Sequence, residues 1–407
     1  MNVNHLRVLA FFSTIFVVVT AGLLVGMYAR GYRFDKDDGK LEVNGLLIVK
    51  SSPEGSQIYI DGELRSVTDD TISLEPDTYT VTVEREGYIP WTKVLEIKKE
   101  EVTEVTAHLF RSAPSLSAVT LHSATQPLPS YDFTKIAYAV LPEETDINTE
   151  VKQGLWILET LNLPLGFSRD PRHITDADLT DATWEWSPDG QEILLTNSEG
   201  TYLISINEFT PETSLINVFR ELPAIRERWE AERKEKLLAQ VRPLPSPIQE
   251  LLTESAKSVV FSPDEEMVMY IASGSATLAD DLISPIPGSS TQTESRELVD
   301  NYTYVYDIEE DRNFLLDENT GNLIIEGGVS PLPSITRRIS WFPTSRNLIL
   351  AQENKVIIMD YDGTNRQTVF AGGYFAPHAF PAGVSLDRIF ILTNLGATSN
   401  LYSVGLK

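Results

Sequence analysis

The chain has 407 residues, 42% of them hydrophobic, which is enough for two or three domains with apolar cores. Acidic residues number 59 against 33 basic ones. The resulting net charge of −26 argues against nucleic acid as a partner, because a nucleic-acid site needs a basic face. Cysteine is absent, and this excludes disulfides, thiolate metal sites and cysteine nucleophiles.

Residues 1–40 begin with an apolar segment and end in a polar stalk. The segment at 8–28, VLAFFSTIFVVVTAGLLVGMY, carries no charge. As a helix that rises about 1.5 Å per residue, it can cross a hydrocarbon core of about 30 Å. It ends without an Ala-x-Ala cleavage pattern, which favours an uncleaved transmembrane helix over a signal peptide. We therefore expect a membrane anchor, with the lipid bilayer as a partner.

Residues 41–111 have the pattern of a small β-sandwich. LLIVKSSPEGSQIYIDGELRSV predicts strands joined by a Pro-Glu-Gly turn and by a hairpin at Asp61-Gly62. Asp-Gly suits a two-residue turn in which both residues have positive φ. TYTVTVEREGYIPWTKVLEI and VTEVTAHLF predict further strands, about five or six in all.

This segment resembles the PEGA domain, a small β-sandwich of bacterial envelope proteins. Ser52 to Ser56 occupy the naming motif, with Ser56 in place of the usual Ala, and IYIDGELR and YTVTVEREGY match the strands that follow. TDDTISL lacks the usual Thr-Pro, and Asp77 replaces a Gly. The resemblance carries no catalytic residues and implies an extracytoplasmic location.

Two opposing observations indicate on which side of the membrane the chain lies. Arg7 precedes the apolar segment, whereas Arg30 and Arg33 follow it, and this distribution leans slightly towards a cytoplasmic carboxyl-terminal part. The resemblance to an envelope domain outweighs that lean. We expect a single-pass protein of the cell membrane, with the bulk of the chain outside the cytoplasm.

One phrase occurs twice in the remaining chain, as WEWSPDGQEILLTN at 184–197 and VVFSPDEEMVMYIA at 259–272. The tetrapeptide Ser187–Gly190 predicts a type I turn, because Ser caps it, Pro presets φ and Gly relaxes its end. With the strand that follows, the phrase forms an antiparallel meander. Five such units occur between residues 128 and 407. Repeated meanders indicate a β-propeller over residues 112–407.

The units resemble the Tol-Pal-type propeller repeat, which they match in WSPDG, FSPD and IIMDYDGTNRQTV. Together with the sandwich, they predict a mainly β chain whose propeller has five to seven blades. We also expect LYSVGLK, at the end of the chain, to pair with SLSAVTLHS, which precedes the first unit. That pairing would close the ring and remove its exposed edges.

Two insertions interrupt the propeller. Residues 211–256 are helical in composition, with an imperfect apolar stripe at helical spacing and a capping box from Ser246 to Gln249; the stripe consists of Leu222, Ile225, Trp229, Leu237 and Leu238. These helices are interpreted as a lid packed on the propeller, with a partner-docking helix as the alternative. Residues 273–299 form a low-complexity loop.

Candidate metal ligands are few. The five histidines, at positions 5, 108, 122, 173 and 378, lack metal-ligand spacing. Asp360, Asp362 and Asn365 could offer oxygens to a calcium ion, although a hairpin between blade strands is the favoured interpretation. No cofactor is expected.

Candidate catalytic residues are also weak, and none is assigned. Asp176, Asp178 and Asp181 could supply the paired carboxylates of glycoside cleavage, or form an acidic loop. Trp184 and Trp186 share one strand face, where they serve either core packing or sugar stacking. A nucleophile elbow and a phosphate loop are both missing from the sequence.

These patterns favour a membrane-anchored envelope protein with a non-catalytic binding or scaffolding role, carried out by the propeller and the PEGA-like domain. The expected partner is an envelope polymer or another envelope protein. The alternative is a propeller enzyme, a hydrolase or lyase, that acts on envelope polysaccharide.

Overall fold

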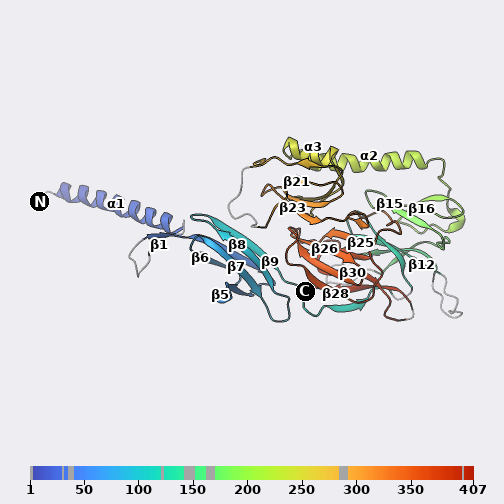
Figure 1. Ribbon diagram of the computed structural model, residues 1–407, viewed down its shortest axis with the longest axis horizontal. Coiled ribbons are helices and arrows are strands. Elements are labelled where there is room, and N and C mark those ends of the chain that lie inside the picture. Colours follow the sequence, from blue (N-terminus) through green and yellow to red (C-terminus); the bar gives the residue numbers. More distant parts are fainter. Residues whose placement is uncertain are drawn as a thin grey trace. The chain divides into compact units, whose positions relative to one another are not determined.

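The fold is taken from a computed structural model, which describes residues 3–29, 32–34, 41–120, 123–141, 152–161, 170–283, 292–396 and 398–407. Contacts divide the chain into two compact units (Figure 1). The first contains Met1–Leu109 and Pro285–Gln292, and the second contains Phe110–Ser284 and Thr293–Lys407. The boundary predicted between residues 111 and 112 stays a prediction.

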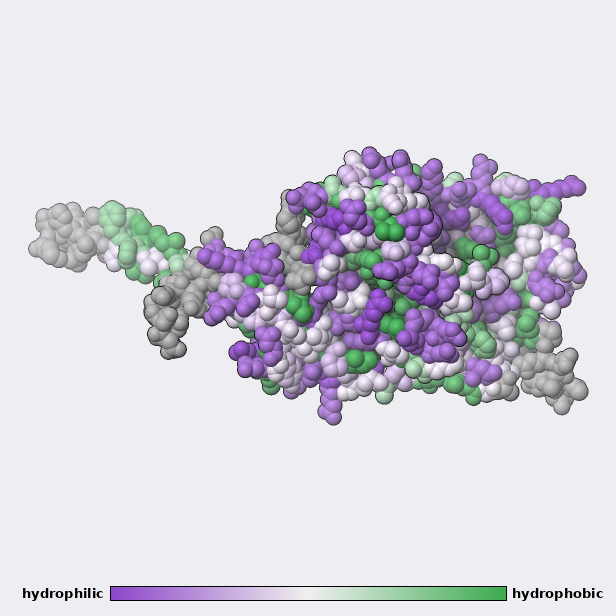
Figure 2. All heavy atoms as spheres, viewed as in Figure 1, coloured by the Kyte–Doolittle hydropathy of each residue, from purple (hydrophilic) through white to green (hydrophobic). Residues whose placement is uncertain are grey.

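The chain begins with helix α1 (Val3–Ala29), which carries His5. Its described side chains include many exposed apolar ones, among them Phe11, Phe12 and Phe16. The described part of the helix is mostly green, the colour of hydrophobic residues, in Figure 2. A membrane span requires a helix that is both long and apolar enough, and among the described residues no helix meets that requirement. The transmembrane helix predicted at 8–28 is therefore not supported. The stalk residues 35–40 lie outside the described chain.

Seven strands form a two-sheet sandwich in the first unit, after a short hairpin of β1 (Tyr32–Phe34) and β2 (Leu41–Val43). One sheet has the order β6-β3-β9 and the other β5-β4-β7-β8. The strands are β3 (Gly45–Ser52), β4 (Gln57–Ile60), β5 (Glu63–Val67), β6 (Asp70–Leu74), β7 (Asp77–Glu84), β8 (Trp91–Ile97) and β9 (Val102–His108). Asp61 and Gly62 have φ of 49° and 82°, which confirms the predicted hairpin.

The second unit consists mainly of five antiparallel sheets that resemble the blades of a propeller. Blade 1 contains β11 (Thr125–Pro129), β12 (Lys135–Val140), β13 (Gly154–Glu159) and β14 (Arg172–Thr175). Blade 2 contains β15 (Thr183–Trp186), β16 (Glu192–Thr196) and β17 (Thr201–Ser205). Blade 3 contains β18 (Ala256–Phe261), β19 (Met267–Ala272), β22 (Thr303–Asp307) and β23 (Arg312–Asp317).

Blades 4 and 5 complete the set. Blade 4 contains β24 (Leu323–Ile324), β25 (Arg337–Trp341), β26 (Asn347–Gln352), β27 (Lys355–Asp360) and β28 (Gln367–Ala371), of which β24 pairs in parallel with β25. Blade 5 contains β29 (Ala379–Ala382), β30 (Ser385–Thr393), β31 (Asn400–Gly405) and β10 (Ser115–Ala118). Five blades in the described chain lie at the lower end of the predicted range.

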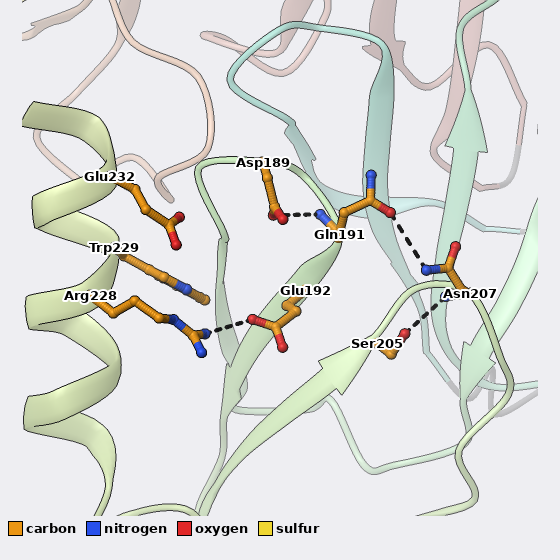
Figure 3. Close-up of a pocket in the computed structure, with 8 residues that line it drawn as sticks. All are labelled: Asp189, Gln191, Glu192, Ser205, Asn207, Arg228, Trp229 and Glu232. Atoms are coloured by element: carbon orange, nitrogen blue, oxygen red, sulfur yellow. Dashed lines mark hydrogen bonds and ion pairs between the residues drawn. The ribbon is translucent and has the colours of Figure 1, made fainter. Parts of the chain in front are cut away.

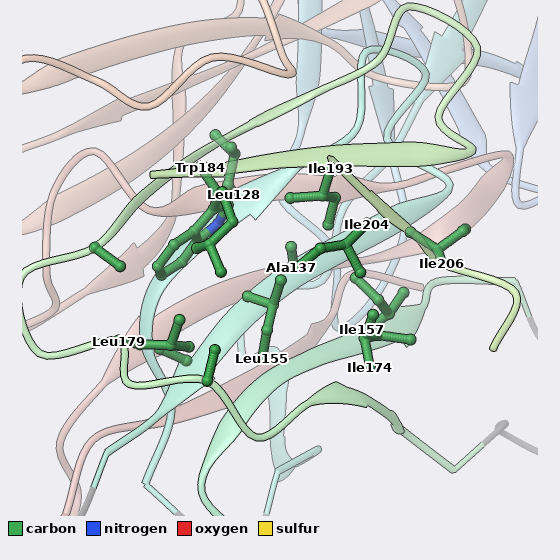
Figure 4. Packing of buried hydrophobic residues seen from close by; sticks show 14 of the residues in the cluster. Leu128, Ala137, Leu155, Ile157, Ile174, Leu179, Trp184, Ile193, Ile204 and Ile206 are labelled. Atoms are coloured by element: carbon green, nitrogen blue, oxygen red, sulfur yellow. The ribbon is translucent and has the colours of Figure 1, made fainter. Parts of the chain in front are cut away.

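Neighbouring blades bury their faces against each other. Blades 1 and 2 share a core that contains Trp184 (Figure 4). Trp186 belongs to the same core, and both tryptophans are at most 2% exposed. Blades 3 and 4 share a second core, blades 4 and 5 a third, and blades 5 and 1 a fourth. The two tryptophans therefore serve core packing rather than sugar stacking.

Blade 5 is built from both ends of the second unit. Strand β10 runs antiparallel to β31, with Ser115 opposite Gly405 and Ala118 opposite Tyr402. The predicted pairing of the chain end with the segment before the first repeat is confirmed.

The helical insertion connects blades 2 and 3, and it follows a 3-10 turn (Glu212–Ser214). Helix α2 (Leu222–Val241) buries Ile225 and Trp229 against blade 2, while its Val241 and helix α3 (Ser246–Glu254) pack on blade 3. The two helices lie along one side of the second unit (Figure 1). This arrangement agrees with the lid interpretation. Part of the predicted stripe was wrong, because Leu238 is 44% exposed.

The predicted capping box of α3 is also wrong. Pro245 precedes the helix as its cap, and Ser246 makes no side-chain capping bond because it already lies in the first turn. The amide of Gln249 instead donates to the carbonyls of Leu244 and Arg242, at 2.7 and 3.1 Å. The loop insertion contains a small hairpin of β20 (Ala276–Thr277) and β21 (Glu297–Leu298).

An unpredicted segment lies among the inner strands of the ring. After β24, Gly328 receives a bond from the Trp186 amide of blade 2 at 2.9 Å and donates to the Pro129 carbonyl of blade 1 at 2.8 Å. Val329 then pairs with Glu185 of β15. Gly328 has φ of 80°, and a Cβ atom there would lie 2.3 Å from the Tyr131 ring. The segment therefore ties blades 1, 2 and 4 together.

Candidate functional site

A cleft of about 590 Å³ opens among blades 1, 4 and 5. Its walls come from the start of β11, the β26–β27 turn, and the segments that lead into β25 and β29. The lining residues are Thr125, Gln126, Thr336, Glu353, Asn354, Tyr374, Phe375, Ala376, His378, Leu392 and Ser399. We call this hollow the inner cleft. It combines exposed aromatic surface, at Phe375, with hydroxyl, amide and carboxylate groups.

Hydrogen bonds hold the walls of the inner cleft in place. The Ser399 hydroxyl of blade 5 donates to the Ala124 carbonyl of blade 1 at 2.8 Å, and the Ala124 amide donates back to the Ser399 carbonyl. The Tyr374 hydroxyl donates to the Gln352 carbonyl at 2.8 Å. Burial raises the pKa of Tyr374, so this phenol stays protonated. The cleft is thus preformed by backbone and side-chain contacts.

His378 forms part of the cleft floor. One ring nitrogen bonds to the Pro127 carbonyl, and within the described residues Nδ1 has no hydrogen-bond partner. Burial, assisted by the charge of Arg338, lowers the pKa of His378 to about 3. The imidazole is therefore neutral at physiological pH.

Arg338 lies behind this floor, on inner strand β25. Its side chain is 1% exposed, and its guanidinium stacks on Phe380 with 5.4 Å between Cζ and the ring centroid. Nη1 donates to the Glu326 carbonyl at 2.6 Å. Burial lowers the pKa of Arg338 to about 10, which leaves the guanidinium charged at neutral pH.

A second pocket, of about 360 Å³, lies between α2 and blade 2 (Figure 3). Arg228 of α2 donates to Glu192 of β16 at 2.7 Å, beside the buried Trp229. Asp189 accepts a hydrogen bond from the Ser187 hydroxyl at 2.6 Å and another from the backbone amide of Gln191. These contacts fix the helix and the turn, so the pocket belongs to the attachment of the insertion.

The three candidate calcium ligands form a hairpin. Asp360 accepts from the amides of Asn347 and Asn365 at 3.0 and 2.8 Å, and Asp362 accepts from Thr364. In the described part of the chain, no group of three or more His, Asp or Glu could hold a metal ion. The structure favours the hairpin interpretation.

The acidic loop before β15 is likewise held by hydrogen bonds to its carboxylates. Asp176 accepts from the Glu212 amide at 2.7 Å, and Asp178 accepts from the Thr180 amide and hydroxyl. The bonds from Thr180 lower the pKa of Asp178, which is the opposite of what a catalytic acid needs.

The remaining described histidines lie in separate elements. His173 stacks on Trp156 at 4.7 Å in blade 1, and His108 ends strand β9 of the first unit. His122 lies outside the described residues.

Sequence reasoning missed Arg338, although a signal was present. Arg337 and Arg338 are adjacent in an alternating strand pattern, TRRISW, so one of the two must face the interior. Arg337 pairs with Asp317, whereas Arg338 points inward.

Comparison with known proteins supports one part of this architecture, the sandwich of the first unit. Residues 44–113 match the PEGA domain. No curated protein matches the chain.

Solved structures that are similar include TolB from Agrobacterium tumefaciens, at 13% identity and a TM-score of 0.21, covering 70% of this chain and 78% of that one. The Cps50 (Swd1) β-propeller domain of Myceliophteria thermophila has 9% identity and a TM-score of 0.27, covering 72% and 99%. An oligogalacturonate lyase in complex with manganese has 10% identity and a TM-score of 0.22, covering 84% and 81%. TM-scores this low do not support a fold assignment, so the propeller assignment depends on the blade topology. The chain therefore contains a PEGA domain at residues 44–113, followed by a β-propeller.

Proposed function

We propose that this protein is a binding module whose propeller receives part of another protein in the inner cleft. The observation that carries the proposal is the cleft itself, where an exposed aromatic ring and polar groups from three blades converge on about 590 Å³. Volumes of roughly 300–1,000 Å³ are typical of ligand sites. A cleft of this size accepts one or two side chains of a partner.

The lining supports a protein as the partner. Phe375 is 48% exposed at the rim, and aromatic anchors of this kind are enriched in protein interfaces. Gln126 and Asn354 line the same cleft with amides, which can both donate and accept hydrogen bonds. An apolar anchor with a polar surround is the ordinary anatomy of a binding hot spot.

Photocrosslinking tests the proposal. Benzoylphenylalanine in place of Phe375 should give protein adducts in producing cells, whereas the same group in place of Val384 should give severalfold fewer. Val384 is the matched control, because it is 71% exposed in the turn between β29 and β30, at the opposite end of blade 5 from Phe375. Equal labelling from both positions, or from Val384 alone, would place the interface elsewhere.

Enzymatic turnover would also overturn the proposal. A purified chain that cleaves an envelope polysaccharide, and loses that activity when Glu353 at the cleft is changed to Gln, would support the hydrolase or lyase alternative.

A location outside the cytoplasm is the second part of the proposal, and the PEGA domain supports it because the family is known from bacterial envelopes. Alkaline phosphatase fused after Lys407 should be active, since its disulfides form only in an oxidising compartment. The same fusion to residues 41–407 alone should be inactive. An inactive full-length fusion that is nevertheless produced in full would show that the location is wrong.

A further inference from the structure

We propose that the group recognised in the inner cleft is a carboxylate, which binds the guanidinium of Arg338. This inference rests on the proposed binding function and specifies its chemistry.

Arg338 has an unusual set of contacts for a buried cation. Within the described residues, its Nε and Nη2 have no hydrogen-bond partner, and none of the ion pairs involves it. Only Nη1 is engaged, by the neutral carbonyl of Glu326. Leaving donors of a buried charge unpaired is costly, so a protein that retains such a group normally supplies an anion for it.

The two unpaired nitrogens identify the anion. Nε and Nη2 lie on the same edge of the planar guanidinium, and together they donate two parallel hydrogen bonds. This fork matches the two oxygens of a carboxylate. A phosphate also fits the fork, but its further oxygens would be buried without donors. The geometry therefore favours a carboxylate.

Two lining residues connect the inner cleft to Arg338, which does not itself line the cleft. Thr336 lines the cleft two residues before Arg338, and residues two apart along an extended chain point to the same face. His378 lines the cleft two residues before Phe380, the ring on which the guanidinium stacks. His378 is close enough to Arg338 to respond to its charge. His378 and the guanidinium both contact the Phe380 ring, with 6.0 Å between the His378 and Phe380 ring centroids, and in this proposal the imidazole separates the guanidinium from the cleft.

Rotation of His378 would give a ligand access. The side chain is held by one hydrogen bond, to the Pro127 carbonyl, and its Nδ1 is unpaired. Rotamer changes of this kind are common when proteins bind partners. We expect the carboxylate to displace the ring from the floor and to take its place against Arg338.

Calorimetric titration of the full chain with small probes tests the inference. Acetylglycine mimics a chain-terminal carboxylate, and acetylaspartate amide mimics an acidic side chain. At least one should bind, with a dissociation constant of about 1 mM. Acetylglycine amide, which lacks the charge, should not. The stronger of the two acids identifies whether the partner presents its terminus or a side chain.

Variants of Arg338 locate the contact. Arg338→Met should weaken binding at least about tenfold, the loss expected when a charge-assisted pair is removed. Arg338→Lys keeps the charge but lacks the fork, and it should give an intermediate loss. The control is Arg337→Met, on the same strand, which removes the pair with Asp317 and should leave binding unchanged. His378→Ala should bind at least as well as the native chain.

An independent measurement on the native chain tests the inference even if the Arg338 variants do not fold. In the native chain labelled with ¹⁵N-arginine, the bound acid should shift one Nε–H proton resonance downfield, as a new bond to a carboxylate does. Absence of any shift, tighter binding of inorganic phosphate, or full loss of binding in His378→Ala would overturn the inference. The proposed function has a separate outcome, because adducts from position 375 without carboxylate binding would leave it intact.

Discussion

The repeated turn shows how single residues define the blades. In Ser187–Gly190 the serine hydroxyl accepts from the amides of Gln191 and Glu192, at 3.1 and 2.8 Å, and donates to Asp189. The same bonds recur at Ser262, where Asp264 and the Met267 amide are the partners. The motif is thus a set of side-chain bonds that starts the second strand of a blade.

Gly190 is needed in this turn because of its backbone conformation. Its φ is +63°, and a Cβ atom there would fit without a clash, in ordinary contact at 3.7 Å from its nearest neighbours. Gly190→Ala should therefore lower the free energy of unfolding by about 1 kcal/mol through backbone strain alone. Urea unfolding of the propeller measures the change.

Gly274→Ala is the matched control, since a Cβ atom at Gly274 would also meet no clash and its φ is not positive. It should change the unfolding free energy by less than about 0.5 kcal/mol. Equal losses in the two variants would mean that conformation at Gly190 is not the cause.

Secondary-structure elements differ in how far the sequence predicts them. Strands that alternate around a turn, such as β15 and β16, were predicted because their pattern is local. The cap of α3 was misassigned, because Ser246 and Pro245 both suit the start of a helix and the choice depends on the preceding loop. The segment around Gly328 could not be predicted, since its partners lie more than a hundred positions away in β15 and β11.

The candidate site was less predictable than the fold. Each lining residue of the inner cleft has an ordinary local context, and only closure of the ring brings Gln126 near His378. Arg338 is unusual because its guanidinium contacts a neutral carbonyl and an aromatic ring. Burial and pairing of this kind are properties of the folded chain.

At the scale of the whole molecule, the ring depends on its last strand. β31 lies between β10 and β30 and contributes Leu401 and Val404 to the cores that blade 5 shares with its neighbours. Deleting residues 401–407 should therefore unfold the propeller in one cooperative step, because two shared cores lose residues and two edges open. Circular dichroism during heating is the measurement.

The control for this deletion is the double substitution of Ser403 and Lys407 to Ala, which keeps the strand and its apolar residues. It should melt close to the native chain. If the deleted chain also melts like the native one, the closing strand is dispensable and the other four blades are stable alone.

Closure by β10 and β31 also has a mechanical consequence. Ser115 is opposite Gly405, so the two chain ends of the propeller leave the strand pair at the same end. A force that pulls these ends apart loads the ladder one hydrogen bond at a time, like a zipper, rather than all bonds together in shear. If a tether holds one end and a load acts on the other, blade 5 should yield first and at low force. Attachment at the β29–β30 turn instead would direct the load through the body of the sheet.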